Sequence, residues 1–474
     1  MLATANAAGY RYGTSDQAFY IPVVVRALEP AAFPRDAALI DAQGRLMLGD
    51  EVLAAAARIT GLPLDALFFA AHLLSLALVW TALVLIGRST YRTQWLTVAL
   101  AAAFTLRHRI PRTSANSFEP YFHPRMLAFS LGALALAAVL RRRYWTAVAL
   151  VGAGAVVHIT TAMWFAILIG VALAILDLRL RRFALVGVAA ATVFLTWALL
   201  GGPLAASLTR MDASWLEAVA SKDSLFASQW PAWAWAANLG LLVALWWAHR
   251  RRQAHGRATA EDAGIVWGAT ALVAVFLVTL PAVVARFALP VQLQIPRVFW
   301  LVDFVALVYL TGAIRRERVA IAVASLLVVV SVSRAVYVMT VEHPERDLFA
   351  IHSQESPWED AMAWVRQQPI DTHVLADPGH AWRYGTSVRV SAERDVLLED
   401  VKDSAIAIYS RDVAMRYLER TRAIGDFNGL TADAARQLAA RYDLDYLITE
   451  ADLPLPRAYS NQQFKIYTLG GDRN

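Results

Sequence analysis

Two carboxylates near the start of the chain have the surroundings of a reactive group. Asp16 lies in an aromatic-framed loop, Tyr10-Arg-Tyr-Gly-Thr-Ser-Asp16-Gln-Ala-Phe-Tyr20, where it can act as a general base toward an attacking hydroxyl group. Ser15-Asp16 also suits the N-cap of a helix that runs from residue 17, and both roles stay open. Asp36, in Phe33-Pro-Arg-Asp36, is the natural second carboxylate, either as a ligand of a divalent metal or as an orienting group.

Two arginines follow prolines at the predicted starts of apolar helices. They are Arg125, in His123-Pro-Arg125, and Arg297, in Gln294-Ile-Pro-Arg297. An arginine near the membrane is costly unless it is paired, and a phosphate group is an obvious partner. A helix N-terminus beside an arginine is a ready anion site. The alternative is that arginines of these loops extend to lipid head groups.

Further candidates are aromatic, imidazole and guanidinium groups. His158 stands between two apolar runs, where the neighbouring threonines could satisfy it or where it could face the same side as Asp16. In Trp382-Arg383-Tyr-Gly-Thr-Ser-Val-Arg389 the aromatic faces suit stacking and the guanidiniums suit phosphate, although a structural turn with solvated arginines explains the same pattern. Tyr12 of the first loop is a further candidate for substrate contact.

The composition is that of an integral membrane protein. The 474 residues are 58% hydrophobic and 17% charged, with a mean hydropathy of +0.44, which lies outside the range of soluble domains. Cysteine is absent, which excludes disulfides and thiolate metal sites. No basic patch is interleaved with aromatic residues, so nucleic acid is not an expected partner. The sequence also lacks a Walker loop, a His-Glu-x-x-His helix and a dinucleotide-binding fingerprint.

Ten apolar segments predict a polytopic α-helical membrane domain over residues 65–340, with about ten transmembrane or partly spanning helices. The segments are 65–87, 94–106, 126–140, 144–157, 158–176, 183–200, 232–248, 264–285, 298–314 and 319–340. A span needs about 20 apolar residues, so three of the segments are too short alone. Short helices at membrane depth persist where protein or a water-filled cavity covers their ends, so we expect 94–106, 126–140 and 144–157 to line a cavity.

Arginines occur in every second connection between these segments. By the positive-inside rule those five connections are predicted to be cytoplasmic, and the other connections, the N-terminal segment and everything after 340 are predicted to face outward. The arginine-bearing connections contain Arg88 and Arg92, Arg141 to Arg143, Arg179 with Arg181 and Arg182, Arg250 to Arg252 with Arg257, and Arg315, Arg316 and Arg318.

The outward regions are predicted to form two further domains. Residues 1–64 are predicted to form an ordered first loop with interfacial helices and a helix over 50–59. Two alternatives stay open for the segment before it. Either a first membrane helix is missing from this chain, or the protein is inserted with its N-terminus outward and has no such helix. Residues 341–474 alternate strands with helices, which predicts an α/β domain. The expected strands are 372–376, 394–398, 444–449 and 464–469, and the expected helices are 357–368, 404–421 and 431–441.

This pattern resembles the GT-C superfamily of membrane glycosyltransferases, which use polyprenyl-phosphate-linked sugars, and in particular uncharacterised DUF6798-like bacterial members. The matching stretches are Gly13-Thr-Ser-Asp16-Gln-Ala-Phe-Tyr20, Phe33-Pro-Arg-Asp36, His123-Pro-Arg125, the histidine-threonine turn at 158–161, Gln294-Ile-Pro-Arg297, Trp358-Glu-Asp-Ala-Met-Ala-Trp364-Val-Arg, and Val374-Leu-Ala-Asp-Pro378 with the following Arg389.

The resemblance implies an enzyme of the bacterial inner membrane whose C-terminal α/β domain is extracytoplasmic. It would transfer a sugar from a polyprenyl-phosphate donor to an extracytoplasmic lipid, glycan or protein acceptor. In that interpretation Asp16, Asp36 and His158 are catalytic. The implied substrate-binding residues are Tyr12, His123, Arg125, Gln294, Arg297, Trp382, Arg383 and Arg389. The alternative is a non-catalytic polytopic protein, a transporter or a lipid- or partner-binding scaffold, with the same polar cavity.

Overall fold

The computed structural model describes residues 1–44, 48–202 and 204–470 and divides into two compact units. The membrane unit comprises residues 1–10, 71–211 and 222–348, and the α/β unit comprises residues 11–70, 212–221 and 349–474. Each unit therefore contains segments that are far apart in the sequence. Residues 11–70 share a unit with the C-terminal region.

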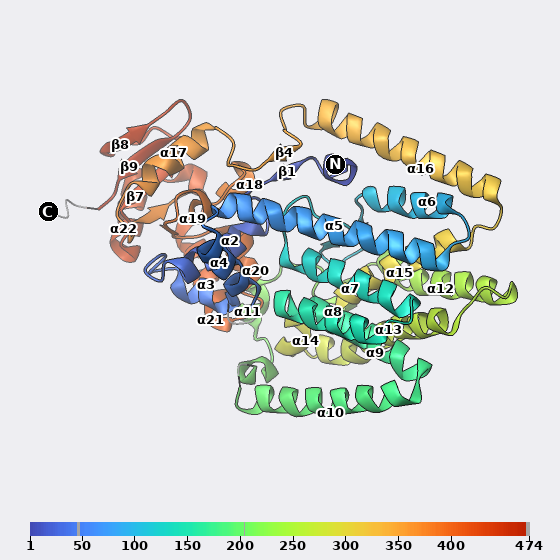
Figure 1. Cartoon of the computed structure of the whole chain (residues 1–474). Coiled ribbons are helices and arrows are strands. Elements are labelled where there is room, and N and C mark those ends of the chain that lie inside the picture. Colours follow the sequence, from blue (N-terminus) through green and yellow to red (C-terminus); the bar gives the residue numbers. More distant parts are fainter. Residues whose placement is uncertain (45–47, 203, 471–474) are drawn as a thin grey trace. The chain divides into compact units, whose positions relative to one another are not determined.

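Each of the ten apolar segments forms a helix (Figure 1). The helices are α5 (Leu64–Thr90, whose first residues belong to the α/β unit), α6 (Gln94–Thr105), α7 (Pro124–Leu140), α8 (Tyr144–Val157), α9 (Ile159–Leu176), α10 (Leu178–Leu200), α12 (Ala232–Ala254), α13 (Ala260–Val284), α15 (Val298–Gly312) and α16 (Glu317–Tyr337). Shorter elements of the membrane unit are α1 (Leu2–Asn6), β2 (Arg109–Ile110), β3 (Ala115–Asn116), η1 (Ala205–Leu208), η2 (Ala227–Gln229), α14 (Ala288–Gln292), η3 (Ile295–Arg297) and η4 (Val338–Glu342).

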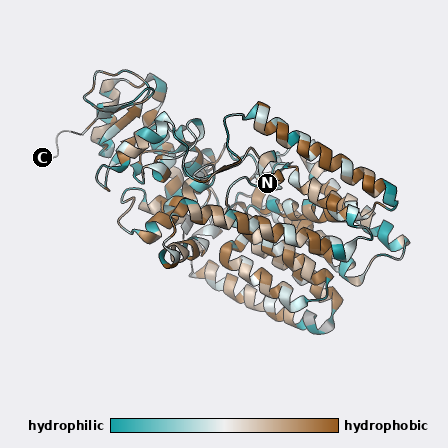
Figure 2. Ribbon diagram, turned by 45° about the horizontal axis from the view of Figure 1, so that its top comes forward, coloured by the Kyte–Doolittle hydropathy of each residue, from teal (hydrophilic) through white to brown (hydrophobic). Residues whose placement is uncertain are grey.

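Among the described residues, six helices are long and apolar enough to cross a membrane. They cover Leu64–Thr90, Ile159–Leu176, Arg181–Leu200, Ala260–Val284, Ala288–Gly312 and Glu317–Glu342. Helices α6, α7 and α8 are shorter, with 12, 17 and 14 residues. Figure 2 shows the hydrophobic residues along the long helices of this unit and hydrophilic residues at many helix ends. The chain is a helical membrane protein.

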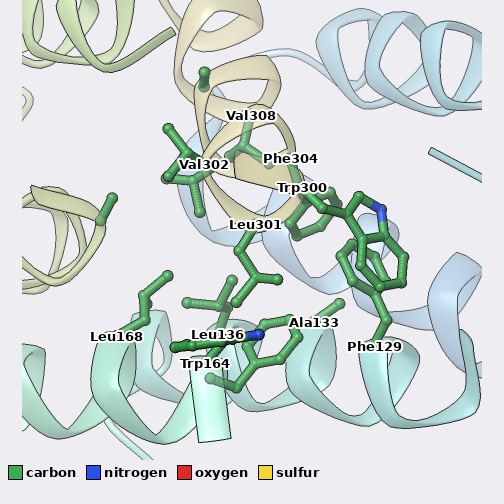
Figure 3. Close-up of a cluster of buried hydrophobic side chains, with 14 of the residues drawn as sticks. Phe129, Ala133, Leu136, Trp164, Leu168, Trp300, Leu301, Val302, Phe304 and Val308 are labelled. Carbon is green, nitrogen blue, oxygen red and sulfur yellow. The ribbon is translucent and has the colours of Figure 1, made fainter. Parts of the chain in front are cut away.

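The core of the membrane unit joins α7, α9 and α15 (Figure 3). Phe129 of α7 stacks on Trp300 of α15 with ring centroids 4.3 Å apart, and it meets Phe165 of α9 edge-on at 5.6 Å. Helices α7 and α9 approach closely because Gly132 has no side chain: a Cβ atom there would lie 2.2 Å from the Phe165 ring. Lipid offers little hydrophobic drive for helix association, so such close contacts hold the helices together.

The α/β unit is built on a five-stranded sheet of order β6-β5-β7-β9-β8. Strand β5 (His373–Leu375) pairs in parallel with β6 (Asp395–Val396) and β7 (Tyr446–Thr449), and β9 (Lys465–Thr468) pairs antiparallel with β7 and β8 (Arg457–Ser460). The four strands expected from the sequence are present, and β8 is an additional edge strand.

The C-terminal helices of this unit are α17 (Pro357–Arg366), α18 (His380–Arg383), α19 (Val388–Ser391), α20 (Asp400–Ile406), α21 (Arg411–Ile424), η5 (Phe427–Gly429) and α22 (Ala432–Tyr442). Helices α17 and α22 match expected ones, the expected helix over 404–421 is divided, and the short helices α18, α19 and η5 were not expected. Thr431 caps α22 as predicted. The single helix predicted over 404–421 is wrong, because the Ser410 hydroxyl accepts a hydrogen bond from the Val413 amide and begins a new helix there.

The N-terminal part of the α/β unit is helical. It contains α2 (Gln17–Leu28), α3 (Ala37–Gly44) and α4 (Gly49–Thr60), the last of which is the helix expected over 50–59. Helix α11 (Ala213–Ala218) completes the unit, and β1 (Tyr10–Arg11) pairs with β4 (Phe349–Ala350).

The contact at Gly132 gives a first prediction. Gly132→Ala places a methyl group against a buried aromatic ring, so we expect it to lower stability by about 1 to 3 kcal/mol, as overpacking of a core does. The control is Gly170→Ala in α9, where an added Cβ would meet nothing within 4 Å, so its effect should stay within about 1 kcal/mol. Thermal unfolding of the two purified variants measures the difference, and equal stabilities would contradict the close approach of α7 and α9.

Candidate functional site

The starts of α7, α9 and α15 carry the polar residues expected from the sequence. His123 is the N-cap of α7, and its Nδ1 accepts a hydrogen bond from the Arg125 amide at 3.2 Å. His158 is the N-cap of α9, and its Nδ1 accepts from the Thr161 amide at 3.2 Å. The two imidazole rings have centroids 6.4 Å apart, so α7 and α9 begin side by side. Each histidine therefore has a capping role.

Arg125 and Arg297 both act on His158. Burial is the largest cause that lowers the pKa of His158 to about 3, and the positive charges of Arg297 and then Arg125 lower it further. The structure thus brings four of the predicted residues, His123, Arg125, His158 and Arg297, into one region of the membrane unit. The His158 imidazole is neutral at physiological pH, so it can accept a hydrogen bond but does not supply a positive charge.

Helix N-termini add to the positive character of this region. Arg297 is the N-cap of α15, and its amide donates to the Gln294 carbonyl at 3.0 Å. Gln294 adopts a left-handed backbone conformation with φ of 49°, which turns the chain into η3 just before α15. The ends of three helix dipoles that carry partial positive charge therefore lie with two guanidinium groups, an arrangement that favours an anion. We call these residues, His123, Arg125, His158, Gln294 and Arg297, the helix-start cluster.

Glu119 is the partner of Arg125 that sequence reasoning did not single out. Its buried carboxylate accepts from Arg125 Nη2 at 2.6 Å and from Arg107 Nη2 at 3.3 Å. This pairing orients Arg125 and places the Glu119 carboxylate between the guanidiniums of Arg107 and Arg125. The dense run of ionisable residues in 107–125 was the signal for this pair. The Asp303 carboxylate of α15 accepts a hydrogen bond from His108 Nε2 at 3.0 Å.

Asp16 lies at the start of α2, in the α/β unit. The chain reaches it through two residues with left-handed backbones, Gly13 at φ 78° and Ser15 at φ 54°. Its Oδ1 accepts from Lys402 Nζ at 2.8 Å, and Lys402 lies 5.6 Å from the centre of the Phe19 ring. Within the described residues, the Asp16 side chain makes no capping hydrogen bond to α2. The helix therefore begins where the cap interpretation expects it, while the carboxylate is directed to a lysine.

Lys402 is the residue in this part of the molecule that the sequence analysis missed. Its side chain is 8% exposed and that of Asp16 is 26% exposed, so the pair is partly shielded from water. The chain has three lysines, and this rarity was the available signal. Tyr12 lies in the same unit, where its amide donates to the Ala350 carbonyl at 3.2 Å and its ring meets Phe68 edge-on.

Asp36 and Arg389 are partners in a buried ionic network. Arg389 Nε donates to Asp36 Oδ2 at 2.7 Å, and Arg389 also pairs with Asp403 at 2.6 Å. Asp36 also accepts a hydrogen bond from Arg416, and Asp36 is fully buried. Burial alone would raise the pKa of Asp36, but the charges of Arg389, Arg416 and Arg420 outweigh it and hold the pKa below its usual value. Both residues therefore join the first loop to the C-terminal part of the α/β unit, a structural role.

The carboxylates do not fit a shared divalent metal. Asp16 is bonded to an ammonium group and Asp36 to guanidinium groups, whereas a metal site needs several oxygen ligands that converge. Over residues 1–44, 48–202 and 204–470, no group of three or more His, Asp or Glu side chains is placed to hold a metal ion.

The predicted binding loop at 382–389 separates into a surface part and a core part. Trp382 is 78% exposed, and Arg383 pairs with Asp377 and lies over the Tyr384 ring. Arg389 is buried with Asp36. The exposed indole of Trp382 is thus the part of this loop that a sugar could stack on, while Arg389 is not at the surface.

No family model matches the chain, and no curated protein matches it either. The site is therefore interpreted from its geometry. The helix-start cluster belongs to the membrane unit and Asp16 to the α/β unit. That these two parts meet around one substrate stays a prediction.

The buried network gives a second prediction. Asp36→Asn leaves Arg389 and Arg416 without their shared charge, so we expect a loss of about 3 to 5 kcal/mol, as for a broken buried ion pair. The control is Asp41→Asn, because Asp41 pairs with Arg26 at 3.0 Å with a side chain that is 40% exposed. Its loss should be about 1 kcal/mol or less. Chemical unfolding of the purified full chain measures both, and a folded, fully stable Asp36→Asn protein would contradict the structural role.

Glu399 gives a third prediction, on pH. Burial raises the pKa of Glu399 to about 7, with Arg389 opposing and Asp403 adding to the rise. Its ordinary value is 4.5, so between pH 4.5 and pH 7 the folded state holds a proton that the unfolded state has lost. The contribution of this group to stability therefore falls as pH rises through that window.

Glu399→Gln keeps a neutral side chain beside Ser387, whose Oγ lies 2.5 Å from Glu399 Oε2. We expect the variant to match the parent near pH 4.5 and to exceed its stability at pH 8 by on the order of 2 kcal/mol. Unfolding midpoints at the two pH values are the measurement. Glu419→Gln, at an exposed pair with Arg441, is the control and should show no such pH-dependent gain. A parallel pH profile of parent and Glu399→Gln would refute the assignment.

Proposed function

We propose that the protein is a membrane glycosyltransferase that moves a sugar from a polyprenyl-phosphate-linked donor to an extracytoplasmic acceptor. The observation that carries the proposal is the helix-start cluster. Two arginines that are 172 positions apart in the sequence act on one buried histidine, where three helices of a membrane protein begin. A lipid-linked phosphate has the charge that such a site favours and the hydrophobic chain that the membrane accommodates.

The chemistry follows from the charges. Asp16 takes the proton of the acceptor hydroxyl as that hydroxyl attacks the sugar C1. The bond between C1 and the phosphate oxygen breaks, and polyprenyl phosphate leaves with the negative charge. Arg125 and Arg297 stabilise that charge as it develops, which is where preorganised donors contribute most to the rate. Lys402 orients Asp16 through its Oδ1. Neutral His158 shapes the site, and Asp36 acts only through the fold.

The resemblance to GT-C enzymes supports the same assignment, since a carboxylate in the first outward loop and a soluble domain beside it are features of that superfamily. In this proposal the arginine-poor ends of the helices face away from the cytoplasm of a bacterial inner membrane. The exposed Trp382 of the α/β unit offers a stacking surface for the acceptor.

The fourth prediction tests this function. The full chain is reconstituted and incubated with a panel of polyprenyl-phosphate hexoses and pentoses and an extract of envelope acceptors, and transfer of labelled sugar is measured. We expect Asp16→Asn to lower turnover by about 10² to 10⁴-fold and Arg297→Ala by about 10² to 10³-fold. The matched controls are Asp41→Asn and Arg112→Ala, whose charges pair elsewhere with Arg26 and Asp223.

Donor binding, measured separately, distinguishes the alternatives. Donor that binds to the parent and less to Arg297→Ala, with no transfer by either, would replace the enzyme with a lipid-binding scaffold or transporter. Turnover that is unchanged in both Asp16→Asn and Arg297→Ala would remove the assignment.

A further inference from the structure

A second basic site lies in the membrane unit, at the other end of α15. A cavity of about 500 Å³ lies where α5 connects to α6 and where α15 connects to α16. Arg252, near the end of α12, and Arg257, in the connection between α12 and α13, complete its lining. Its lining includes four arginines, Arg92, Arg252, Arg257 and Arg315. Helix α15 has 15 residues, or about 22 Å at 1.5 Å per residue, so this cavity is separate from the helix-start cluster.

The arginines of this cavity repel one another. Burial lowers the pKa of Arg257, and the charges of Arg92, Arg315 and Arg252 lower it further, so all four guanidiniums are close together. The carboxylates nearby are Asp262, which pairs with Arg252 at 3.0 Å, and Glu317 in the cavity lining. Four positive groups therefore face two negative ones, and the excess charge favours an anion.

Asp262 cannot neutralise the other arginines because its oxygens are already engaged. Besides Arg252, it accepts from the Tyr309 hydroxyl at 2.9 Å and from the Thr259 amide at 2.9 Å, within the capping box that begins α13. The helix cap and the ion pair thus use the same carboxylate. Within the described lining, Glu317 is the remaining carboxylate for Arg92, Arg257 and Arg315, so the cavity keeps an excess of positive charge.

Arg252 is held in a fixed position in the lining of the cavity. The residue is 6% exposed, its Nη1 donates to the Thr90 carbonyl at 3.1 Å and its Nη2 binds Asp262, which holds the side chain in place. Among the described residues its Nε has no hydrogen-bond partner, and neither do the buried Nε of Arg257 and Oγ1 of Thr90. These atoms are closed off from the cavity, so it is the guanidinium charge of Arg252, held in a fixed position, that the cavity offers to an anion.

We propose that this cavity binds a phosphate ester, through the guanidiniums of Arg92, Arg252, Arg257 and Arg315. The ligand is either the head group of an anionic phospholipid or a soluble phosphorylated compound, since both present the same oxygens. Basic pockets between membrane helices on the arginine-rich side are suited to lipid phosphates. The site does not depend on the proposed transferase activity.

The fifth prediction uses the full chain in nanodiscs of phosphatidylcholine. One arm adds inorganic pyrophosphate to the solution, and the other replaces a tenth of the lipid with phosphatidylglycerol. The bound anion should raise the unfolding midpoint of the parent by several degrees. The double variant Arg257→Gln/Arg315→Gln should bind at least about tenfold more weakly, as expected when two charge-assisted contacts are removed. The control is Arg141→Gln/Arg250→Gln, which removes the same charge from exposed positions outside the cavity.

The stability of the unliganded double variant is a second readout. Because it removes like charges from a crowded cluster, we expect its midpoint in pure phosphatidylcholine to equal or exceed that of the parent. A response to phosphatidylglycerol alone identifies a lipid head group, and a response to pyrophosphate identifies a soluble ligand. The proposal is overturned if neither anion shifts the parent, if the cavity variant responds as the control does, or if the unliganded variant is clearly less stable than the parent.

Discussion

The close contact between α7 and α9 is the interaction on which the helix-start cluster depends. Gly132 lets the Phe165 ring lie against the α7 backbone, and Gly268 of α13 similarly meets the Leu168 backbone of α9. In lipid, contacts of this kind replace the hydrophobic effect as the source of helix association. With Phe129 stacked on Trp300, the same core also holds α15, so the three helices begin together. The positions of His123, His158 and Arg297 follow from this packing.

The molecule uses buried charge in two different ways. In the α/β unit, the two carboxylates of Asp36 and Asp403 are matched by the guanidiniums of Arg389 and Arg416, and hydrogen bonds link these groups into a structural junction between distant parts of the chain. In the membrane unit, the cavity at the other end of α15 is lined by four arginines and one glutamate, and the helix-start cluster brings Arg125 and Arg297 to the starts of apolar helices. Charge is costly at membrane depth, and the two proposals of an anionic ligand rest on these two regions.

The ion pair of Asp16 and Lys402 differs from both of these arrangements. The two residues form a matched pair, yet the pair is only partly buried and lies beside the aromatic ring of Phe19. Ser15, a non-glycine residue with a left-handed backbone, precedes Asp16, and such backbone strain is more common at functional sites than in ordinary turns. The carboxylate is therefore oriented by its lysine and is still partly accessible to water.

Hydropathy and periodicity are local properties, so the amino-acid sequence was sufficient to predict the membrane class, the ten apolar helices and four of the five strands of the α/β sheet. It also indicated His123, Arg125, His158 and Arg297, since a polar residue at the start of an apolar helix is visible in the chain. Only the tertiary structure decided the partners. Asp36 meets Arg389 across more than 350 positions, and Asp16 meets Lys402 across a similar distance. The break at Ser410 and the pairing of Glu119 with Arg125 likewise depend on which groups are brought together. The residue type defines the chemistry that a side chain can perform. Burial and neighbouring charges decide whether that side chain contributes to folding or to a reaction.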